Sequence, residues 1–503
     1  MSSRINVLQL GPTNFSKEYQ IHEDVKWFYE VDLTHVKLKM FDVVILSRNI
    51  NEEERELLFT LSKAYCVFIY HDFVLGNETL WLAKSKKANF VRSKELEKLL
   101  KEDIVDYYPK PYGEKYDPHN LAIKDNFKDN VIWKGYNGVT LEGEFGEDFI
   151  QIAYWRNSIP VFQNQSIDFW LEYEKTGNVE IKLCITQFVS GSVCSIQNTW
   201  EFDEEQMKDI VYITNEKKDG PIFVSIKAKG SGSLKIVGLH DRYSRRGKGA
   251  FLPGGERKVT SKREEIFFYF DPGDMKPPLN VYFSGYKTQE GFEGYNMMRK
   301  MGCPFLLISE SRLEGGAFYL GDEEYEQLMV ESIDHYLEEL GFSSEQMIMS
   351  GLSMGTFGAL YYGCDFKPNA IIVGKPLASI GDVANNERIN RPGGFPTSLD
   401  VLFKQYSSLD EESVQKLNKR FWDKFDNVSW DDTRFIVSYM IEDDYDSTAY
   451  PTLLSHINND FVEVYSKGIH GRHNDNTGGI VSWFIGRYNY ILNEYFEREF
   501  EEE

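Results

Sequence analysis

The stretch from residue 347 to 358, MIMSGLSMGTFG, constrains the fold of this chain more than any other. It begins as a short apolar strand, passes through a Gly-x-Ser-x-Gly turn and continues as a helix. The backbone of the serine is strained at such a turn. Gly351 and Gly355 remove the Cβ atoms that would clash there. This order is the nucleophile elbow of an α/β-hydrolase fold, with Ser353 as the nucleophile. The alternative is an ordinary serine in a glycine-rich turn.

The chain is too long for a single hydrophobic core, because 503 residues exceed the size at which one core stops growing. Residues 1–110 alternate strands with helices, which predicts a small doubly wound parallel sheet. The segment Leu10-Gly11-Pro12-Thr13 follows the first predicted strand, yet it lacks the further glycines and the lysine of a phosphate-binding loop. We therefore expect a Rossmann-like domain without catalytic activity.

Residues 120–240 change to an alternation of apolar and polar residues, interrupted by Gly, Asn and Asp turns. Several short strands at this spacing predict a β-sandwich of the jelly-roll type. The segment is rich in aromatic residues, among them Trp155 and Trp170. Their rings can either stack on sugars or form the core of the sandwich, and we favour the core.

Residues 241–263 are expected to form a basic linker in a chain whose net charge is −23. The linker is either a solvated connection or a patch that binds acidic lipid headgroups or an acidic partner. The negative charge of the whole chain argues against a nucleic-acid-binding protein. The basic residues, counted from the end of the sandwich, are Arg242, Arg245, Arg246, Lys248, Arg257, Lys258, Lys262 and Arg263.

Residues 264–498 return to alternating strands and helices, as in an α/β-hydrolase catalytic domain. In this fold an acid and then a histidine follow the nucleophile, each after a later strand. Glu442 and Asp443 follow the predicted strand 434–440. Asp443 has the usual position, and Glu442 is the alternative acid. The loop after the predicted strand 462–465 contains His470 and His473, and we favour His473, which lies nearer the last helix.

These residues predict acyl transfer through an acyl-enzyme. A serine hydroxyl needs a base within hydrogen-bond reach, so His473 takes the proton of Ser353 and the acid orients the imidazole. The oxyanion hole is expected to use the N–H of Met354 and, after the strand 280–283, the N–H of Tyr286. Arg312 either faces this site or forms a surface ion pair, and we favour the ion pair. These residues do not identify the acceptor of the acyl group. Transfer to water would make the protein an esterase, and transfer to a sugar hydroxyl would make it an acyltransferase.

Cysteine usage and the lack of targeting signals indicate the compartment. The 5 cysteines are scattered without metal-type spacing, which predicts reduced thiols and a cytoplasmic protein. The sequence shows no signal-peptide pattern and no apolar run of membrane-spanning length, so we expect a soluble protein with at most peripheral membrane contact. No metal, cofactor or coenzyme A motif is recognisable. We expect no tightly bound cofactor, and the acetyl donor is unidentified.

Four segments together resemble the second accessory secretory protein family of the accessory Sec system of streptococci and staphylococci. They are residues 6–13, 351–358, 439–446 and 470–475. The resemblance covers essentially the full length. It implies a cytoplasmic protein that acts with two sister accessory secretory proteins, an accessory motor ATPase and a translocon to export a glycosylated serine-rich repeat adhesin.

The resemblance also implies an enzymatic role and particular site residues. Members of the family O-acetylate N-acetylglucosamine on the adhesin with a Ser–acid–His triad. By position the nucleophile is Ser353 and the base His473, while Asp443 and Glu442 compete as the acid. The sandwich domain of the family resembles a carbohydrate-binding module. The alternatives are a transport scaffold in which the hydrolase domain is only structural, and a simple carbohydrate esterase.

Overall fold

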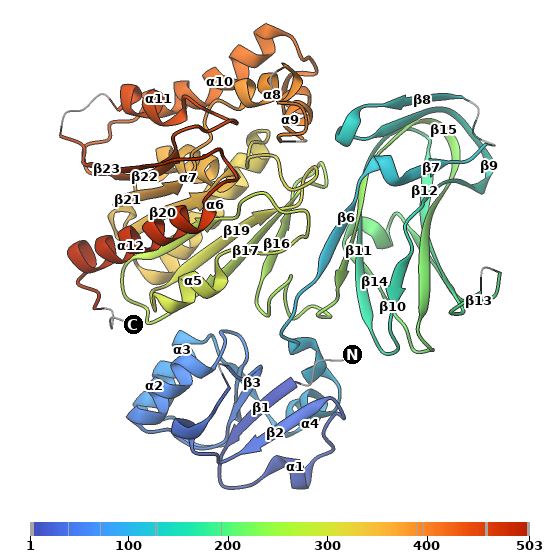
Figure 1. Cartoon of the computed structure of the whole chain (residues 1–503). Coiled ribbons are helices and arrows are strands. Elements are labelled where there is room, and N and C mark those ends of the chain that lie inside the picture. Colours follow the sequence, from blue (N-terminus) through green and yellow to red (C-terminus); the bar gives the residue numbers. More distant parts are fainter. Residues whose placement is uncertain are drawn as a thin grey trace.

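The computed structural model describes residues 5–499 apart from 39, 71, 126, 128, 193, 390, 396 and 458–460. Its strands form three sheets (Figure 1). A small α/β domain lies at the bottom of the view, a β-sandwich on the right and a larger α/β domain at the upper left. This architecture confirms the fold class predicted from the sequence. No helix in the described ranges is both long and apolar enough to cross a bilayer.

The small domain is built on a parallel sheet in the order β2-β1-β3-β4-β5, which is a doubly wound order. Its strands are β1 (Ile5–Leu10), β2 (Val25–Tyr29), β3 (Val43–Leu46), β4 (Val67–Tyr70) and β5 (Asn89–Val91). Its helices are α1 (Phe15–Glu18), α2 (Glu52–Leu61), α3 (Asn77–Ser85) and α4 (Ser93–Lys101). Helix α2 begins at a capping box, in which Asn51 and Glu54 each accept the other's backbone N–H.

The β-sandwich contains two strands far longer than the sequence pattern predicts, β9 (Val139–Trp155) and β15 (Gly220–Tyr243). The first half of β15 pairs with β12 (Glu180–Phe188) and its second half with β11 (Ser166–Gly177). Gly230 and Gly232 have positive φ between these halves, so they bend a continuous strand instead of ending it. The other strands are β6 (Gly113–Tyr116), β7 (Leu121–Ile123), β8 (Asn130–Trp133), β10 (Ile159–Val161), β13 (Ile196–Asp203) and β14 (Val211–Thr214).

The two tryptophans considered for sugar stacking are buried. Trp155 is 1% exposed and belongs to the sandwich core. Trp170 is 2% exposed and lies between the guanidinium groups of Arg257 and Arg263, 4.0 and 3.7 Å from its ring. Neither ring is accessible to a sugar, so the packing interpretation is the right one for both.

The basic segment is only in part a solvated linker, because Arg246 and Lys262 are exposed while other arginines of the segment are buried. Arg242 lies in β15, and residues Glu256–Val259 form β16, the first strand of the next sheet. Arg245 is 1% exposed, and its guanidinium donates to the carbonyl oxygens of Asp106, Tyr108 and Phe251. The buried arginines therefore join the three parts of the molecule and are not available to acidic lipids.

The large domain has the strand order β16-β17-β19-β18-β20-β21-β22-β23. The first two neighbour pairs are antiparallel, and every later pair is parallel. The strands after β16 are β17 (Glu265–Asp271), β18 (Leu279–Phe283), β19 (Phe305–Glu310), β20 (Met347–Leu352), β21 (Ala370–Gly374), β22 (Arg434–Met440) and β23 (Val464–Ile469).

Helices cover both faces of this sheet. Helices α5 (Tyr295–Lys300) and α12 (Thr477–Phe496) share one buried cluster with the strands, and most of the other helices share a second. These others are α6 (Glu323–Leu340), α7 (Met354–Phe366), α8 (Ile380–Ile389), α9 (Ser398–Tyr406), α10 (Glu411–Asp426) and α11 (Ala449–His456). In sheets of this kind ligands bind beyond the carboxyl ends of the parallel strands, so we expect the functional site at that edge.

A buried ion network joins the sandwich to the large domain, and Arg242 is at its centre. Its Nη1 and Nη2 donate to Glu265 at 2.7 and 2.6 Å, and its Nε to Glu290 at 2.6 Å. Arg242→Ala is expected to lower the free energy of unfolding by about 3–5 kcal/mol, because each of two buried carboxylates loses one of its charged partners. Urea denaturation measures this. Lys416→Ala, which breaks an exposed pair with Glu412, is the control with little effect.

His240 makes the stability of this network depend on pH. Burial lowers the pKa of His240, but the charge and hydrogen bond of Glu290 and the nearby charge of Glu172 outweigh it and raise the pKa above 6.5. The protonated imidazole therefore stabilises the fold fully below pH 6.5, and this contribution is lost as the pH rises through the folded-state pKa. We expect unfolding free energy to fall over that range, and less steeply in His240→Gln. Equal slopes in the two proteins would contradict this assignment.

Candidate active site

Strand β20 passes into helix α7 through the turn predicted from the sequence. Ser353 has φ 52° and ψ −122°, a strained conformation for a residue with a side chain. A Cβ on Gly351 would lie 2.3 Å from the carbonyl oxygen of Gly355, and one on Gly355 would lie 2.1 Å from that of Phe283. The backbone leaves no room for side chains at these two positions. The turn presents the Ser353 hydroxyl above the carboxyl end of β20.

Three side chains from different strand ends meet at this turn. Ser353 Oγ lies 2.8 Å from His473 Nε2, and His473 Nδ1 lies 2.8 Å from Asp443 Oδ2. His473 is 0% exposed and Asp443 is 8% exposed. The sheet order brings together residues that are 120 and 30 positions apart in the chain. A serine, an imidazole and a carboxylate in this sequence can move a proton from the hydroxyl to Nε2.

The loop after β22 fixes the carboxylate and the imidazole. Asp443 Oδ1 accepts the N–H groups of Tyr445 and Asp446 at 2.9 and 3.2 Å, which leaves Oδ2 for the imidazole. The backbone N–H of His473 donates to Asp444 Oδ1 at 3.0 Å, and its ring packs 4.3 Å from that of Tyr445. The orientation of both side chains is therefore determined before any substrate binds.

The alternative acid and the alternative histidine pair with each other, away from this site. His470 Nδ1 lies 2.9 Å from Glu442 Oε1, and their side chains are 83% and 52% exposed. Glu442 also accepts the Gly471 N–H. The structure thus brings Asp443, not Glu442, to His473, and the second histidine of the loop points to solvent.

The two candidate oxyanion donors lie on adjacent segments. Met354 is the first residue of α7, so its N–H is at the positive end of the helix dipole. Tyr286 follows Gly285, whose N–H donates to Glu293 at 2.7 Å. Among the described residues, neither the Met354 nor the Tyr286 N–H has a protein acceptor. Burial and the nearby Glu314 raise the pKa of the Tyr286 hydroxyl to about 12, so it stays protonated.

Arg312 is neither a surface ion-pair residue nor part of the site. It is 1% exposed, donates to Glu310 at 2.7 Å and lies 3.6 Å from the ring of Tyr325. Glu310 in turn accepts the N–H groups of Ala317 and Tyr319. Arg312 therefore holds the loop after β19, and the expectation of an exposed side chain is wrong.

One neighbour of the site was not singled out from the sequence. Lys375 follows β21, is 6% exposed, and its Nζ lies 3.4 Å from Thr477 Oγ1. Burial lowers the pKa of Lys375, and the charge of Asp443 opposes that shift. A cation near Asp443 favours the ionised carboxylate. The only sequence signal is a lysine directly after an apolar strand, which is too common to assign.

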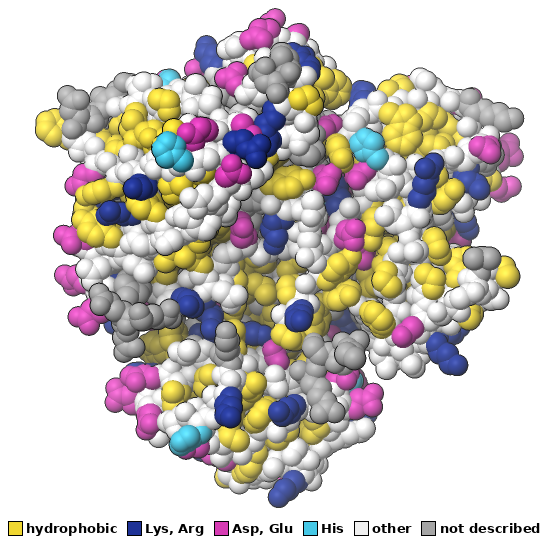
Figure 2. Space-filling view, in the orientation of Figure 1, with side chains coloured by type: hydrophobic (Ala, Val, Ile, Leu, Met, Phe, Trp, Pro, Cys, Tyr) yellow, Lys and Arg dark blue, Asp and Glu magenta, His cyan; other side chains and the backbone are white. Residues whose placement is uncertain are grey.

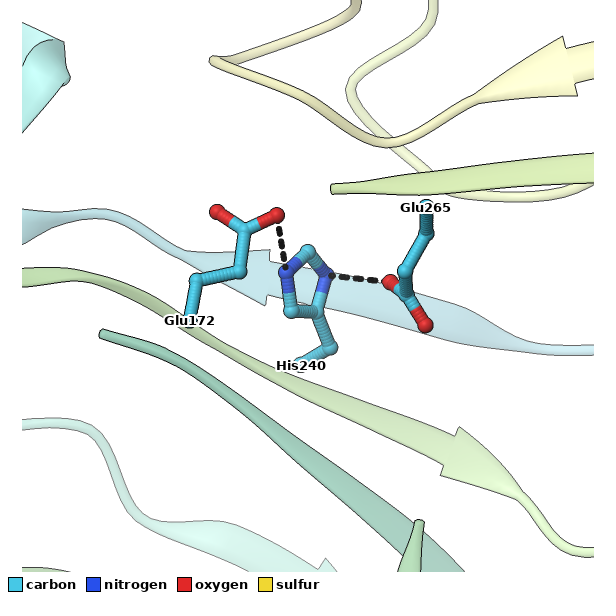
Figure 3. Close-up of side chains that lie close together, drawn as sticks. All are labelled: Glu172, His240 and Glu265. Carbon is cyan, nitrogen blue, oxygen red and sulfur yellow. Dashed lines mark ion pairs between the residues drawn. The ribbon is translucent and has the colours of Figure 1, made fainter. Parts of the chain in front are cut away.

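A second cluster has the composition of a metal site but is already neutralised. Figure 3 shows His240 between Glu172 and Glu265, with possible ligand atoms within 4.8 Å of one another. Lys115 Nζ lies 2.9 Å from Glu172, and Glu265 binds both Arg242 and Arg257. Three cations therefore occupy the positions around these carboxylates, and the cluster fits an internal ion network better than a metal.

The fold and this geometry define a protein of the α/β-hydrolase fold whose elbow serine faces a histidine–aspartate pair. Within that class, the chain belongs to the accessory Sec system GspB-transporter family, whose profile matches residues 5–498. This confirms the resemblance seen in the sequence.

Relatives and a solved structure extend over nearly the whole chain. An accessory Sec system protein of Staphylococcus aureus is 38% identical, covering 99% of this chain and 98% of the relative. One from Streptococcus gordonii is 36% identical, covering 99% and 100%. The solved Glycosylation Associate Protein (Gap123) complex from Streptococcus agalactiae contains a chain that is 34% identical with a TM-score of 0.87. That match covers 99% of this chain and all of the other.

Proposed function

We propose that this protein O-acetylates N-acetylglucosamine on a serine-rich repeat glycoprotein adhesin and takes part in the export of that adhesin. The observation that carries the enzymatic part is the hydrogen-bonded chain from Ser353 through His473 to Asp443. Membership of the accessory Sec family supports the export role.

In the first half of the reaction, Ser353 Oγ attacks the carbonyl carbon of the acetyl donor while His473 Nε2 takes its proton. The N–H groups of Met354 and Tyr286 bind the oxyanion. The intermediate then collapses, the bond to the donor's leaving group breaks, and His473 returns the proton to that group. Asp443 stays ionised and stabilises the imidazolium.

In the second half, His473 removes a proton from a sugar hydroxyl, whose oxygen attacks the acetyl–Ser353 ester. The second oxyanion collapses, and the serine oxygen leaves with the proton held by His473. The acetyl donor is a substrate in this scheme, and no tightly bound cofactor is needed. The protein acts at the cytoplasmic face of the membrane, together with two sister accessory proteins and an accessory motor ATPase.

The test scores the two roles separately in one variant. Cells that carry Ser353→Ala are expected to export the adhesin with no acetyl groups on its glycan, measured by mass spectrometry. His470→Ala is the matched control and should leave the acetyl groups in place. Acetylation that persists in a folded Ser353→Ala protein would refute the catalytic role. If Ser353→Ala abolished both acetylation and export, the separation of the two roles would be refuted.

A further inference from the structure

A cavity of about 220 Å³ lies between the large α/β domain and the β-sandwich, beside the elbow. One wall contains Gly285 and Met354, the segments that hold the candidate oxyanion donors. The opposite wall comes from the sandwich, with Glu114 of β6 and, from the following turn, Asn120. One water needs roughly 10–15 Å³ of such volume, so the cavity has room for a much larger group. Figure 2 shows both acidic and basic side chains along the seam between the two parts.

The two walls are held in a fixed relation by direct contacts. The Glu290 N–H donates to the Gly113 carbonyl at 2.9 Å, and Glu114 forms an antiparallel bridge with Gln289. Lys115 reaches across to the Ser311 carbonyl at 3.1 Å. Strand β6 of the sandwich is therefore attached to the loop that carries Tyr286. A group bound between the walls would be positioned relative to the elbow by both domains.

The charge of the lining selects the kind of group that fits. The cavity is lined by five carboxylates and two ammonium groups. Glu290 and Glu310 pair with arginines, whereas Glu114 and Glu314 pair with tyrosine hydroxyls, which bring no positive charge. The resulting negative potential repels phosphate and carboxylate groups. A neutral group rich in hydroxyls is not repelled by this potential. Its hydroxyls can donate hydrogen bonds to the carboxylates.

Two further polar side chains stand free at the rim. Thr288 and Gln289 line the cavity and are exposed. Within the described part of the chain, neither side chain makes a hydrogen bond to another residue. Both are available to bind hydroxyl groups of a ligand.

We propose that this interdomain cavity is the acceptor subsite, and that it holds the neutral sugar whose hydroxyl attacks the acetyl–Ser353 ester. The β-sandwich thus contributes one wall of the active site, through β6 and the turn after it, and not through an exposed tryptophan platform. This rests on the proposed acetyl transfer.

The kinetic test uses the full-length protein, p-nitrophenyl acetate as donor and methyl N-acetyl-β-glucosaminide as acceptor. Gln289→Trp fills the rim and is expected to lower the ratio of transfer to hydrolysis at least about tenfold, because the acceptor is no longer positioned. The matched control is Gln327→Trp, an exposed glutamine on α6 outside the cavity lining. An unchanged ratio in Gln289→Trp would overturn the proposal.

A binding measurement separates this proposal from the proposed activity. Saturation-transfer NMR on wild type and on Gln289→Trp is expected to show contact with the neutral glycoside in the wild type only. N-acetylglucosamine 6-phosphate should give no signal with either. Equal binding of the phosphorylated sugar, or undiminished binding by Gln289→Trp, would refute the acceptor subsite. A wild type that binds the glycoside but never transfers acetyl would refute the activity and leave the subsite standing.

Discussion

His473→Ala is expected to lower turnover of an acetyl ester by about 10⁶-fold, because a serine without its base is as inactive as a missing nucleophile. The imidazole is the only group that contacts both the Ser353 hydroxyl and the Asp443 carboxylate among the described residues. The rate of p-nitrophenolate release from p-nitrophenyl acetate measures the effect. Circular dichroism verifies that the variant is folded.

His470→Ala is the matched control from the same loop. Its imidazole is 83% exposed and pairs only with Glu442. We expect its rate to stay within about twofold of wild type, since neither side chain touches the reacting atoms. Similar losses in the two histidine variants would show that the loop as a whole, and not His473, determines activity.

Asp443→Asn is expected to lower turnover by about 10⁴-fold, because an amide can hold the imidazole in the wrong tautomer and cannot stabilise the imidazolium. The amide still fits the space of the carboxylate, whose Oδ1 accepts two backbone N–H groups. The rate of ester turnover against pH measures the effect, and the loss should persist at every pH at which the protein is folded.

Glu442→Gln tests the competing assignment of the acid. The Glu442 carboxylate is half exposed and accepts the Gly471 N–H, a bond that glutamine can also accept. Turnover should stay within about twofold of wild type. A larger loss in Glu442→Gln than in Asp443→Asn would transfer the role of the acid to Glu442.

The elbow could be predicted from the sequence because its requirements are local. The positions of Gly351 and Gly355 relative to Ser353 follow from backbone clashes within one turn. Most strands of the large sheet could be located for a similar reason, since a buried strand is a continuous apolar run, whereas their order in the sheet comes from the structure. The choice between Asp443 and Glu442 could not, because it depends on which neighbouring N–H groups the turn after β22 presents to each carboxylate.

Two features of the fold were hidden by residue types that usually mark loops. Glycines at 230 and 232 suggested a turn between two strands, whereas both lie within the single strand β15. Arginines between residues 241 and 263 suggested a solvated linker, whereas Arg242 is buried against Glu265 of the next sheet and Arg245 against Asp106, 139 positions away. Such pairing depends on how domains dock, which local patterns do not encode.

Trapping the acyl-enzyme tests the central claim most directly. Wild-type protein mixed with p-nitrophenyl acetate, quenched rapidly and digested, is expected to carry one acetyl group on the peptide that contains Ser353. Added methyl N-acetyl-β-glucosaminide should shorten the lifetime of that ester and become acetylated itself. An acetyl group that is found on another residue, or that forms equally in Ser353→Ala, would contradict acyl transfer through this serine.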